Sequence, residues 1–423
     1  ITRMPPNEDP WETERYYGAI VEDVTITSRL PVVYVFMPNW SAAYNEVGTL
    51  GCVWHRDEFY DNVQFDLHGQ STSSGSFPKK SLNLDFPNDH RFHYGGTRRV
   101  KDIDLLSNWA DKAKVRNAIA ADWFAEFGMP AHFSFPVRVH SNGVFFSTYD
   151  VIEDADERFL ERLGFDGAGA LYKMYQALTS SYVYAEKKTR QWEPNSDLQD
   201  LIDALNPARP LAERSRWVFD NVDIPRAVNY FVARAVINDT DHGHKNYYLY
   251  RDSNGSLLWT LLPWDVDLCL GHRWTSTYAY FDPNVYTNET YLSTSGNRLY
   301  RALLDTPAFR AMVAARMRTA MDRFLGPPGT TNGWFEQRIR WWLDQLDPPD
   351  VAMSDADLDY AKWGSWTPWQ TAREAGDEIL NLFLPGRRWY LETQTVTNGG
   401  LIPMTPPAFS PIAIGRIESS PAS

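Results

Sequence analysis

The sequence predicts an α+β protein with two lobes, a β-rich first lobe and a mostly helical second lobe. Two observations lead to this fold class. Short apolar runs alternate with turn residues through the first third of the 423-residue chain. From about residue 196 onward the apolar spacing becomes helical. At roughly 150 residues per domain, a chain of this length forms two or three globular units.

The composition is that of a globular protein. Hydrophobic residues make up 43% of the chain and charged residues 22%, and no apolar stretch approaches the ~18 residues of a membrane-spanning helix. The net charge of −13 argues against a general attraction to nucleic acid or anionic lipid. The 17 Trp, 22 Tyr and 22 Phe are typical of a large core, and also of proteins that meet surfaces or carbohydrate; we favour the core.

Several short runs in residues 1–155 predict the β-rich lobe. Strands are expected at 31–37, 49–54, 62–69 and 81–86. A helix is expected over 110–128, where Gly128 and Pro130 provide a stop signal. Two further strands flank Asn142 and Gly143, which suit a tight hairpin turn. A short helix follows that hairpin.

Residues 156–398 predict the mostly helical lobe. Pro225 fits the first turn of a helix beginning at Ile224. A strong hairpin signal lies at 246–267, and helices are expected at 197–205, 213–222, 224–239, 298–325, 333–346 and 371–395. Residues 399–423 are rich in Pro and Ser, so we expect a linker to a truncated C-terminal partner domain.

Most of the candidate catalytic and metal-binding residues lie at the two ends of a predicted hairpin. If Asn254 and Gly255 form a two-residue turn with positive φ at both positions, Asn246 lies opposite Pro263. The loops before and after the hairpin then meet, and bring together a set of oxygen and nitrogen side chains: Asp239, Asp241, His244, Asn246, Asp265 and Asp267. Such oxygen ligands suit a hard cation such as Mg²⁺.

The order of three of these residues matches a phosphoryl-transfer site. Asp241 is followed five residues later by Asn246, then by the hairpin and Asp265. Kinase-type sites place the base, the second metal ligand and the first metal ligand in this order. The spacing alone leaves open that these are loop, cap and turn residues. An EF-hand beginning at Asp239 would need Glu where Tyr250 stands, and no HExxH pattern supports a zinc hydrolase.

A Ser-rich loop in the first lobe leads into a strand that begins with two lysines. Ser71 and Ser73 lie in the loop, and Lys79 and Lys80 follow it. Backbone N–H groups and hydroxyls of such a loop can contact phosphates while a Lys reaches the phosphate oxygens. Lys80 is favoured over Lys79 because it shares the face of Leu82, Leu84 and Phe86 in the alternation of the strand. A plain hairpin loop remains the alternative, since neither Gly-rich nucleotide motif is present.

Three segments together resemble the CotH family of spore-coat and cell-surface atypical kinases. They are GQSTSSGSFPKKSLNLDF, then DKAKVRNAIAADWFAEFG with NGVFFSTYDVIEDADERFL, and DHGHKNYYLYRDSNGSLLWTLLPWDVDLCLG. Their order and spacing agree with the family over roughly residues 60–275. The resemblance implies a two-lobed, atypical protein-kinase-like fold, with the nucleotide on the side of residues 1–155 and the metal hairpin in residues 156–398.

The resemblance also implies an activity and a place of action. It implies a secreted or surface protein, its signal peptide removed, that uses ATP and Mg²⁺ or Mn²⁺ to phosphorylate Ser or Thr of coat or surface proteins. The chain begins at Ile1 without a leader, which fits that expectation. Transfer of AMP by the same fold, and a catalytically weak adhesion module, remain alternatives.

The family pattern implies roles for individual residues. Asp241 would be the base, Asn246 and Asp265 the metal ligands, and Asp267 a further metal candidate. Lys80 or Lys79 would contact the nucleotide phosphates.

Other family positions leave their roles open. Glu153 would anchor that lysine or contact nucleotide, although Asp122 and Glu126 are alternative partners. Asp111 and Arg116 suit a structural ion pair. His68 stands where many relatives have Arg, and the pairing of Cys52 with Cys269 is left open.

Overall fold

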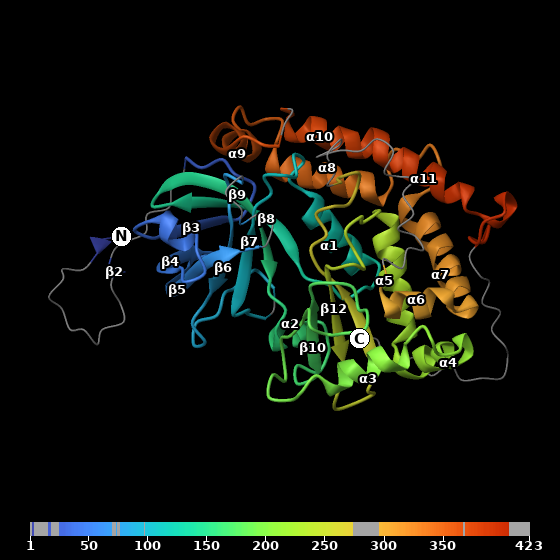
Figure 1. Cartoon of the computed structure of the whole chain (residues 1–423). Coiled ribbons are helices and arrows are strands. Elements are labelled where there is room, and N and C mark those ends of the chain that lie inside the picture. Colours follow the sequence, from blue (N-terminus) through green and yellow to red (C-terminus); the bar gives the residue numbers. More distant parts are fainter. Residues whose placement is uncertain are drawn as a thin grey trace, which may run out of the picture.

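The computed structural model describes residues 2–3, 16–17, 25–69, 73, 77–96, 98–273, 296–366 and 369–405. It has a mixed α/β fold, as the sequence predicts (Figure 1). Within the described residues, no helix is long and apolar enough to cross a membrane. Cys52 and Cys269 are both buried and free, so they do not pair.

A closed barrel forms the first part of the chain. Its strand order is β3-β4-β5-β6-β7-β9-β8, and all neighbours are antiparallel except β3 and β8. The interior is apolar because alternate residues point inward, among them Val63, Leu84 and Val151. The strands are β3 (Val32–Phe36), β4 (Thr49–His55), β5 (Glu58–His68), β6 (Ser81–Asp85), β7 (Asp102–Leu106), β8 (Ser134–Ser141) and β9 (Val144–Glu153). A two-stranded pair, β1 (Thr2–Arg3) and β2 (Tyr16–Tyr17), precedes the barrel.

The second part combines a four-stranded sheet with most of the helices. The sheet order is β11-β10-β12-β13. Trp264 and Ile152 belong to a small core that joins this sheet to β9 of the barrel. The strands are β10 (Ala170–Met174), β11 (Ala185–Lys187), β12 (Tyr247–Arg251) and β13 (Trp259–Pro263). The helices are α2 (Glu157–Arg162), α3 (Ser196–Ala204), α4 (Leu211–Asn221), α5 (Ile224–Val236), α6 (Arg298–Asp305), α7 (Pro307–Ala320), α8 (Trp334–Leu346), α10 (Ala372–Glu378) and α11 (Leu384–Thr393).

One C-terminal helix lies against the barrel instead. Helix α9 (Asp355–Trp363) was not expected from the sequence, and it lies beside β9 in Figure 1. Trp363 Nε1 donates a 2.9 Å hydrogen bond to the carbonyl oxygen of Phe146 in β9. A segment that the sequence assigned to the helical lobe therefore packs against the barrel.

Two local expectations are corrected. Helix α1 (Arg116–Glu126) begins later than residue 110, because the carboxylate of Asp111 accepts the backbone N–H of Ala113, Val115 and Arg116 in a turn. The β12–β13 register pairs Tyr247, not Asn246, with Pro263.

The shifted hairpin register has a local cause in its connecting loop. The loop is longer than a two-residue turn, with Leu257 at φ 63° and the carboxylate of Asp252 accepting the N–H of Ser256. The predicted meeting of the flanking loops is still found, since Trp264 N donates to the carbonyl oxygen of Asn246 at 3.3 Å.

Candidate active site

The loop between α5 and β12 is held at both ends by one buried arginine. Arg234 of α5 forms a fully buried ion pair with Asp239 and donates a 3.0 Å hydrogen bond to the carbonyl oxygen of Asn246. Burial raises the pKa of Asp239 to about 6, against the opposing charge of Arg234. Asp239 is therefore bound by Arg234, and its role is to position this loop.

Asp241 lies in the middle of this loop among three donors. Asn246 Nδ2 donates to its Oδ2 at 2.8 Å, Lys245 Nζ lies 3.1 Å from Oδ2, and His244 Nε2 lies 2.8 Å from Oδ1. Burial acts to raise the pKa of Asp241, but these partners outweigh it, so the pKa lies below its ordinary value. The carboxylate is thus ionised and oriented at neutral pH.

Asp265 and Asp267 follow β13 and present two carboxylates without partners. Within the described part of the chain, neither side chain has a hydrogen bond or an ion pair. Burial and the charge of Asp241 raise the pKa of Asp265, and burial and the charge of Asp265 raise that of Asp267 well above its ordinary value. Such crowding of negative charge is relieved when a cation binds.

The backbone supports a functional reading of these loops. Asn246 has φ 61° and Asp265 has φ 51°, in the left-handed region that non-glycine residues adopt at a cost. Conformations of this kind gather at functional sites, where the surrounding structure holds them. Asn246 and Asp265, which the sequence spacing marks as candidate metal ligands, therefore also have strained backbone conformations.

The donor set fits a hard cation with few protein ligands. Among the residues that the structure describes, no group of three or more His, Cys, Asp or Glu side chains is gathered to hold a metal ion. The metal ligands that the sequence predicts are few: Asp265, Asp267 and the amide oxygen of Asn246. Mg²⁺ is commonly bound this way, by one or two carboxylates together with water and nucleotide phosphates.

The two lysines before β6 have different surroundings. Lys80 is half-buried, and its Nζ donates to the carbonyl oxygen of Ser73 at 3.3 Å, so it contacts the one residue of segment 70–76 that the structure describes. Ser71 lies outside the described residues. Lys79 is completely buried, and its Nζ lies 2.9 Å from Asp359 Oδ1 in α9. Lys80, and not the buried Lys79, is therefore the lysine that contacts Ser73.

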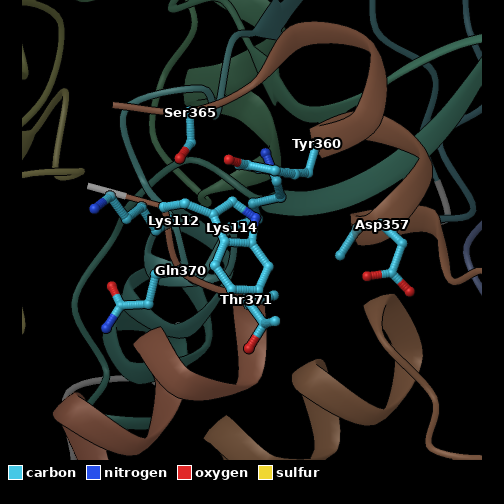
Figure 2. Close-up of a pocket in the computed structure, with 10 residues that line it drawn as sticks. Lys112, Lys114, Asp357, Tyr360, Ser365, Gln370 and Thr371 are labelled. Carbon is cyan, nitrogen blue, oxygen red and sulfur yellow. The ribbon is translucent and has the colours of Figure 1, made fainter. Parts of the chain in front are cut away.

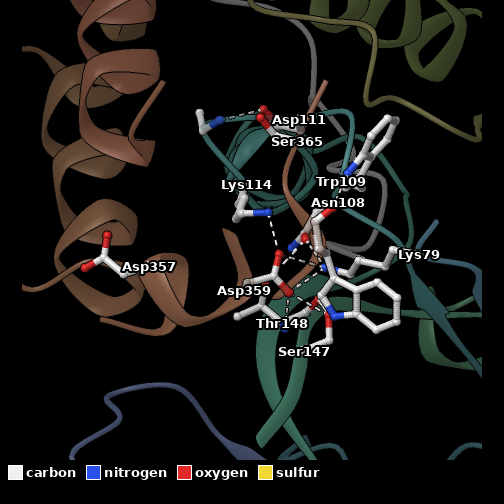
Figure 3. A network of polar contacts seen from close by, with 12 residues as sticks. Lys79, Asn108, Trp109, Asp111, Lys114, Ser147, Thr148, Asp357, Asp359 and Ser365 are labelled. Atoms are coloured by element: carbon white, nitrogen blue, oxygen red, sulfur yellow. Dashed lines mark hydrogen bonds and ion pairs between the residues drawn. The ribbon is translucent and has the colours of Figure 1, made fainter. Parts of the chain in front are cut away.

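Asp359 contacts several donors from the barrel and from the segment before α1 (Figure 3). Lys114 Nζ lies 2.7 Å from Oδ2, and Ser147 Oγ and Thr148 N donate to Oδ1 at 2.6 and 2.8 Å. Burial acts to raise the pKa of Asp359, but Lys114 and Lys79 hold it well below its ordinary value. A small cavity of about 30 Å³ lies beside this network, between Lys112, Tyr360 and Thr371 (Figure 2), and is lined by none of the Asp241 loop.

Glu153 does not anchor either lysine. Its carboxylate pairs with Arg162 of α2 and accepts the backbone N–H of Phe133 at 3.3 Å. Asp122 also pairs elsewhere, with Arg338 at 3.4 Å. Neither acid pairs with Lys80, the lysine that the sequence favoured. Lys79 pairs instead with Asp359, which no local sequence pattern marks.

The pair of Asp111 and Arg116 is structural, as the sequence suggested. Arg116 bonds to Asp111 and donates from Nε to the carbonyl oxygen of Cys269 at 3.0 Å and from Nη2 to that of Leu270 at 3.2 Å. These carbonyls lie two and three residues after Asp267. The pair therefore fixes the segment that carries the unpartnered carboxylates against α1.

Sequence reasoning named His68 but missed Lys173, and the charges of both act on Asp265. Lys173 of β10 is half-buried with Nζ 4.7 Å from the ring centroid of Trp264, and no described carboxylate pairs with it. His68 pairs with the buried Asp104 at 2.9 Å. The charges of both favour the ionised form of Asp265 and so oppose the rise in its pKa. Lys173 reaches its position against Trp264 because β10 pairs with β12.

Comparison with known proteins now gives the family. Residues 65–331 match the family described as CotH kinase protein. The chain belongs to the CotH kinase family. The matched span contains Asp241, Asn246 and Asp265, whereas Asp359 and α9 lie beyond it. The family resemblance inferred from the sequence is thereby confirmed.

Relatives of this CotH kinase chain are distant. It is 28% identical over 225 residues to the inner spore coat protein H of Bacillus subtilis (strain 168), a match that covers 49% of this chain and 59% of that protein. The chain thus spans less than two thirds of the length of that relative.

Two solved structures resemble the chain only weakly. One is a Shewanella oneidensis MR-1 complex of HipA, HipB and operator DNA, at 13% identity and TM-score 0.32, covering 76% of this chain and 70% of that chain. The other is the Helicobacter pylori proinflammatory kinase CtkA, at 10% identity and TM-score 0.27, covering 82% and 92%. These likenesses are too weak to support an argument about fold or mechanism.

Proposed function

We propose that this CotH kinase domain transfers the γ-phosphoryl group of ATP to a Ser or Thr hydroxyl of a coat or surface protein, with Mg²⁺ or Mn²⁺. The observation that carries the proposal is the pairing of Asp241 with Asn246 beside the two unpartnered carboxylates of Asp265 and Asp267. The name of the Bacillus subtilis relative supports a coat protein as acceptor, and the family supports ATP as donor.

Each side chain of the site has a role in this proposal. Asp241, ionised and held by Asn246, orients the acceptor hydroxyl and takes its proton. Asn246, Asp265 and Asp267 would hold the cation, which when bound offsets the charge of the phosphates. Lys80 and the hydroxyl of Ser73 contact the phosphates from the Ser-rich loop. The complete burial of Lys79 favours Lys80 for that contact.

The test separates phosphoryl transfer from its alternatives. Purified chain is incubated with Mg²⁺ or Mn²⁺, with casein as a Ser-rich acceptor, and with ATP labelled at either the α or the γ phosphate. We expect label on protein from γ only, and loss of that label in Asp241→Asn and Asp265→Asn. Asp220→Asn, an exposed carboxylate on α4, is the matched control and keeps the activity.

Other outcomes overturn the proposal. Label from the α phosphate would mean AMP transfer on the same site. Absence of both protein labelling and phosphate release to water, with folded protein and either metal, would favour a binding module. Retention of metal-dependent ATP binding in Asp265→Ala at wild-type affinity would remove Asp265 from the metal site.

A further inference from the structure

A lysine, an asparagine and an aspartate meet in the barrel wall away from the Asp241 loop. Lys79 precedes β6, Asn108 follows β7, and Asp150 lies in β9, so three successive strands of the barrel bring them together. Lys79 and Asp150 are completely buried and Asn108 is 3% exposed. Lys79 Nζ lies 2.8 Å from Asn108 Oδ1, and Figure 3 shows the two side chains meeting.

The amide of Asn108 is held on both sides. Its Nδ2 donates to Asp150 Oδ1 at 3.3 Å, while Asp150 Oδ2 accepts from Asn117 Nδ2 at 3.0 Å. The hydroxyl of Thr148 donates to Asn108 Oδ1 at 3.4 Å. Burial raises the pKa of Asp150 to about 6, although Asn117 and Lys79 oppose the rise. A carboxyl group able to exchange protons near neutral pH therefore contacts the nitrogen of the amide.

The charges around Lys79 favour its neutral amine. Lys79 and Lys114 share the carboxylate of Asp359, and no other described carboxylate lies within ion-pair distance of either ammonium. Burial lowers the pKa of Lys79 to about 7, against the charge of Asp359. The ring of Tyr149, whose centroid lies 4.9 Å from Nζ, adds an apolar wall. Removing the charge of Lys79 leaves Lys114 and Asp359 as a balanced pair.

The geometry points to an intramolecular isopeptide bond between Lys79 Nζ and Asn108 Cγ. The amine lone pair of Lys79 attacks Cγ, and the C–N bond forms while the charge on Oδ1 is stabilised by the Thr148 hydroxyl. Asp150 takes a proton from the attacking nitrogen and gives a proton to Nδ2, so the Cγ–Nδ2 bond breaks and ammonia leaves. Asp150 ends as it began, and the reaction needs no oxidant or cofactor.

This bond is independent of phosphoryl transfer. It links the strand that leaves the Ser-rich loop to the segment between β7 and α1, and it uses none of the residues assigned to the cation or to the acceptor. A covalent link between neighbouring strands would hold Lys80 at the start of β6 when the barrel is stressed by heat or denaturant. The bond therefore adds a self-modification to the domain rather than a step to its catalysis.

The test is the mass of the whole purified chain after denaturation and reduction. We expect a mass lower than that of the sequence by one ammonia molecule. After trypsin digestion, fragmentation should identify a branched peptide joining the segments of Lys79 and Asn108. An Asn that cyclises to a succinimide also loses ammonia, so the branched peptide is the deciding observation. A folded wild-type chain at the full sequence mass overturns the proposal without any variant.

Variants assign the atoms of the bond. Lys79→Met, Asn108→Ala and Asp150→Asn should each restore the full sequence mass. Lys80→Arg, next to Lys79 but half-buried, should keep the branched peptide, and is the matched control. Persistence of the mass loss in Lys79→Met or Asn108→Ala would place it elsewhere in the chain and refute the bond.

Discussion

Lys79 Nζ lies 2.9 Å from Asp359 Oδ1, and both side chains are completely buried although 280 residues separate them in the sequence. Lys79 lies at the start of β6, and Asp359 lies in α9, beyond the residues that match the CotH kinase family. The same carboxylate binds Lys114 before α1 and the backbone of Thr148 in β9. A single side chain thus joins the segment before β6, the segment before α1 and strand β9 to α9.

Replacing Asp359 should destabilise the fold strongly. Asp359→Ala leaves the ammonium of Lys114 buried without a partner, and losing one member of a buried pair costs about 3–5 kcal/mol. We expect that drop in the free energy of unfolding, measured with urea. Asp220→Ala, the same change on the surface of α4, should alter it by less than about 1 kcal/mol. Equal effects of the two substitutions would contradict the role of Asp359.

Removing one unpartnered carboxylate should stabilise the protein without added cation. In Asp267→Asn the repulsion from Asp265 is lost, so the free energy of unfolding in EDTA should rise by about 1 kcal/mol. The increase in Tm on adding Mg²⁺ should become smaller than in wild type. Asp220→Asn is the control for the loss of one negative charge. A wild-type response to Mg²⁺ in Asp267→Asn would show that Asp267 does not bind the cation.

Lys173 should contact the nucleotide. Its ammonium packs against Trp264, the residue before Asp265, and has no described carboxylate partner. A charged hydrogen bond contributes about 1.5–3 kcal/mol. Lys173→Met should therefore raise KM for ATP by about tenfold or more, with a smaller change in kcat. Lys187→Met, on neighbouring β11 and with its Nζ bonded to the carbonyl oxygen of Pro194, should leave KM unchanged. An unaltered KM in Lys173→Met would exclude the contact.

His55 should make the barrel sensitive to acid. Burial lowers its pKa from 6.5 to about 4, so between these values the unfolded chain binds a proton that the folded chain does not. This contribution is complete above pH 6.5 and is lost as the pH falls toward 4. His55→Gln should reduce the stability difference between pH 7.5 and pH 5 by about 2 kcal/mol.

Denaturation at the two pH values measures the effect of His55. The same substitution at His90, whose side chain is 43% exposed, is the control. A pH dependence in His55→Gln equal to that of wild type would exclude this histidine as the cause.

Short-range patterns predicted the elements with local signals. The hairpin of β8 and β9 follows from Asn142 and Gly143, both at positive φ in the structure. The prediction of α5 follows from its apolar face and from Pro225 in its first turn. The register of β12 and β13 was wrong by one residue, because the side chain of Asp252 caps a longer loop. The spacing of apolar residues does not show whether a side chain lengthens a turn.

The sequence by itself determined the mixed α/β fold, the family and the window from Asp241 to Asp267, because these depend on residue spacing along neighbouring segments. The roles of Asp241, Asn246 and Asp265 stay predictions. Only the tertiary structure decided that Lys79 pairs with Asp359, that Glu153 pairs with Arg162, and that Lys173 packs against Trp264, the residue before Asp265. Such pairings depend on which distant segments pack together, and burial then sets the charge of each group.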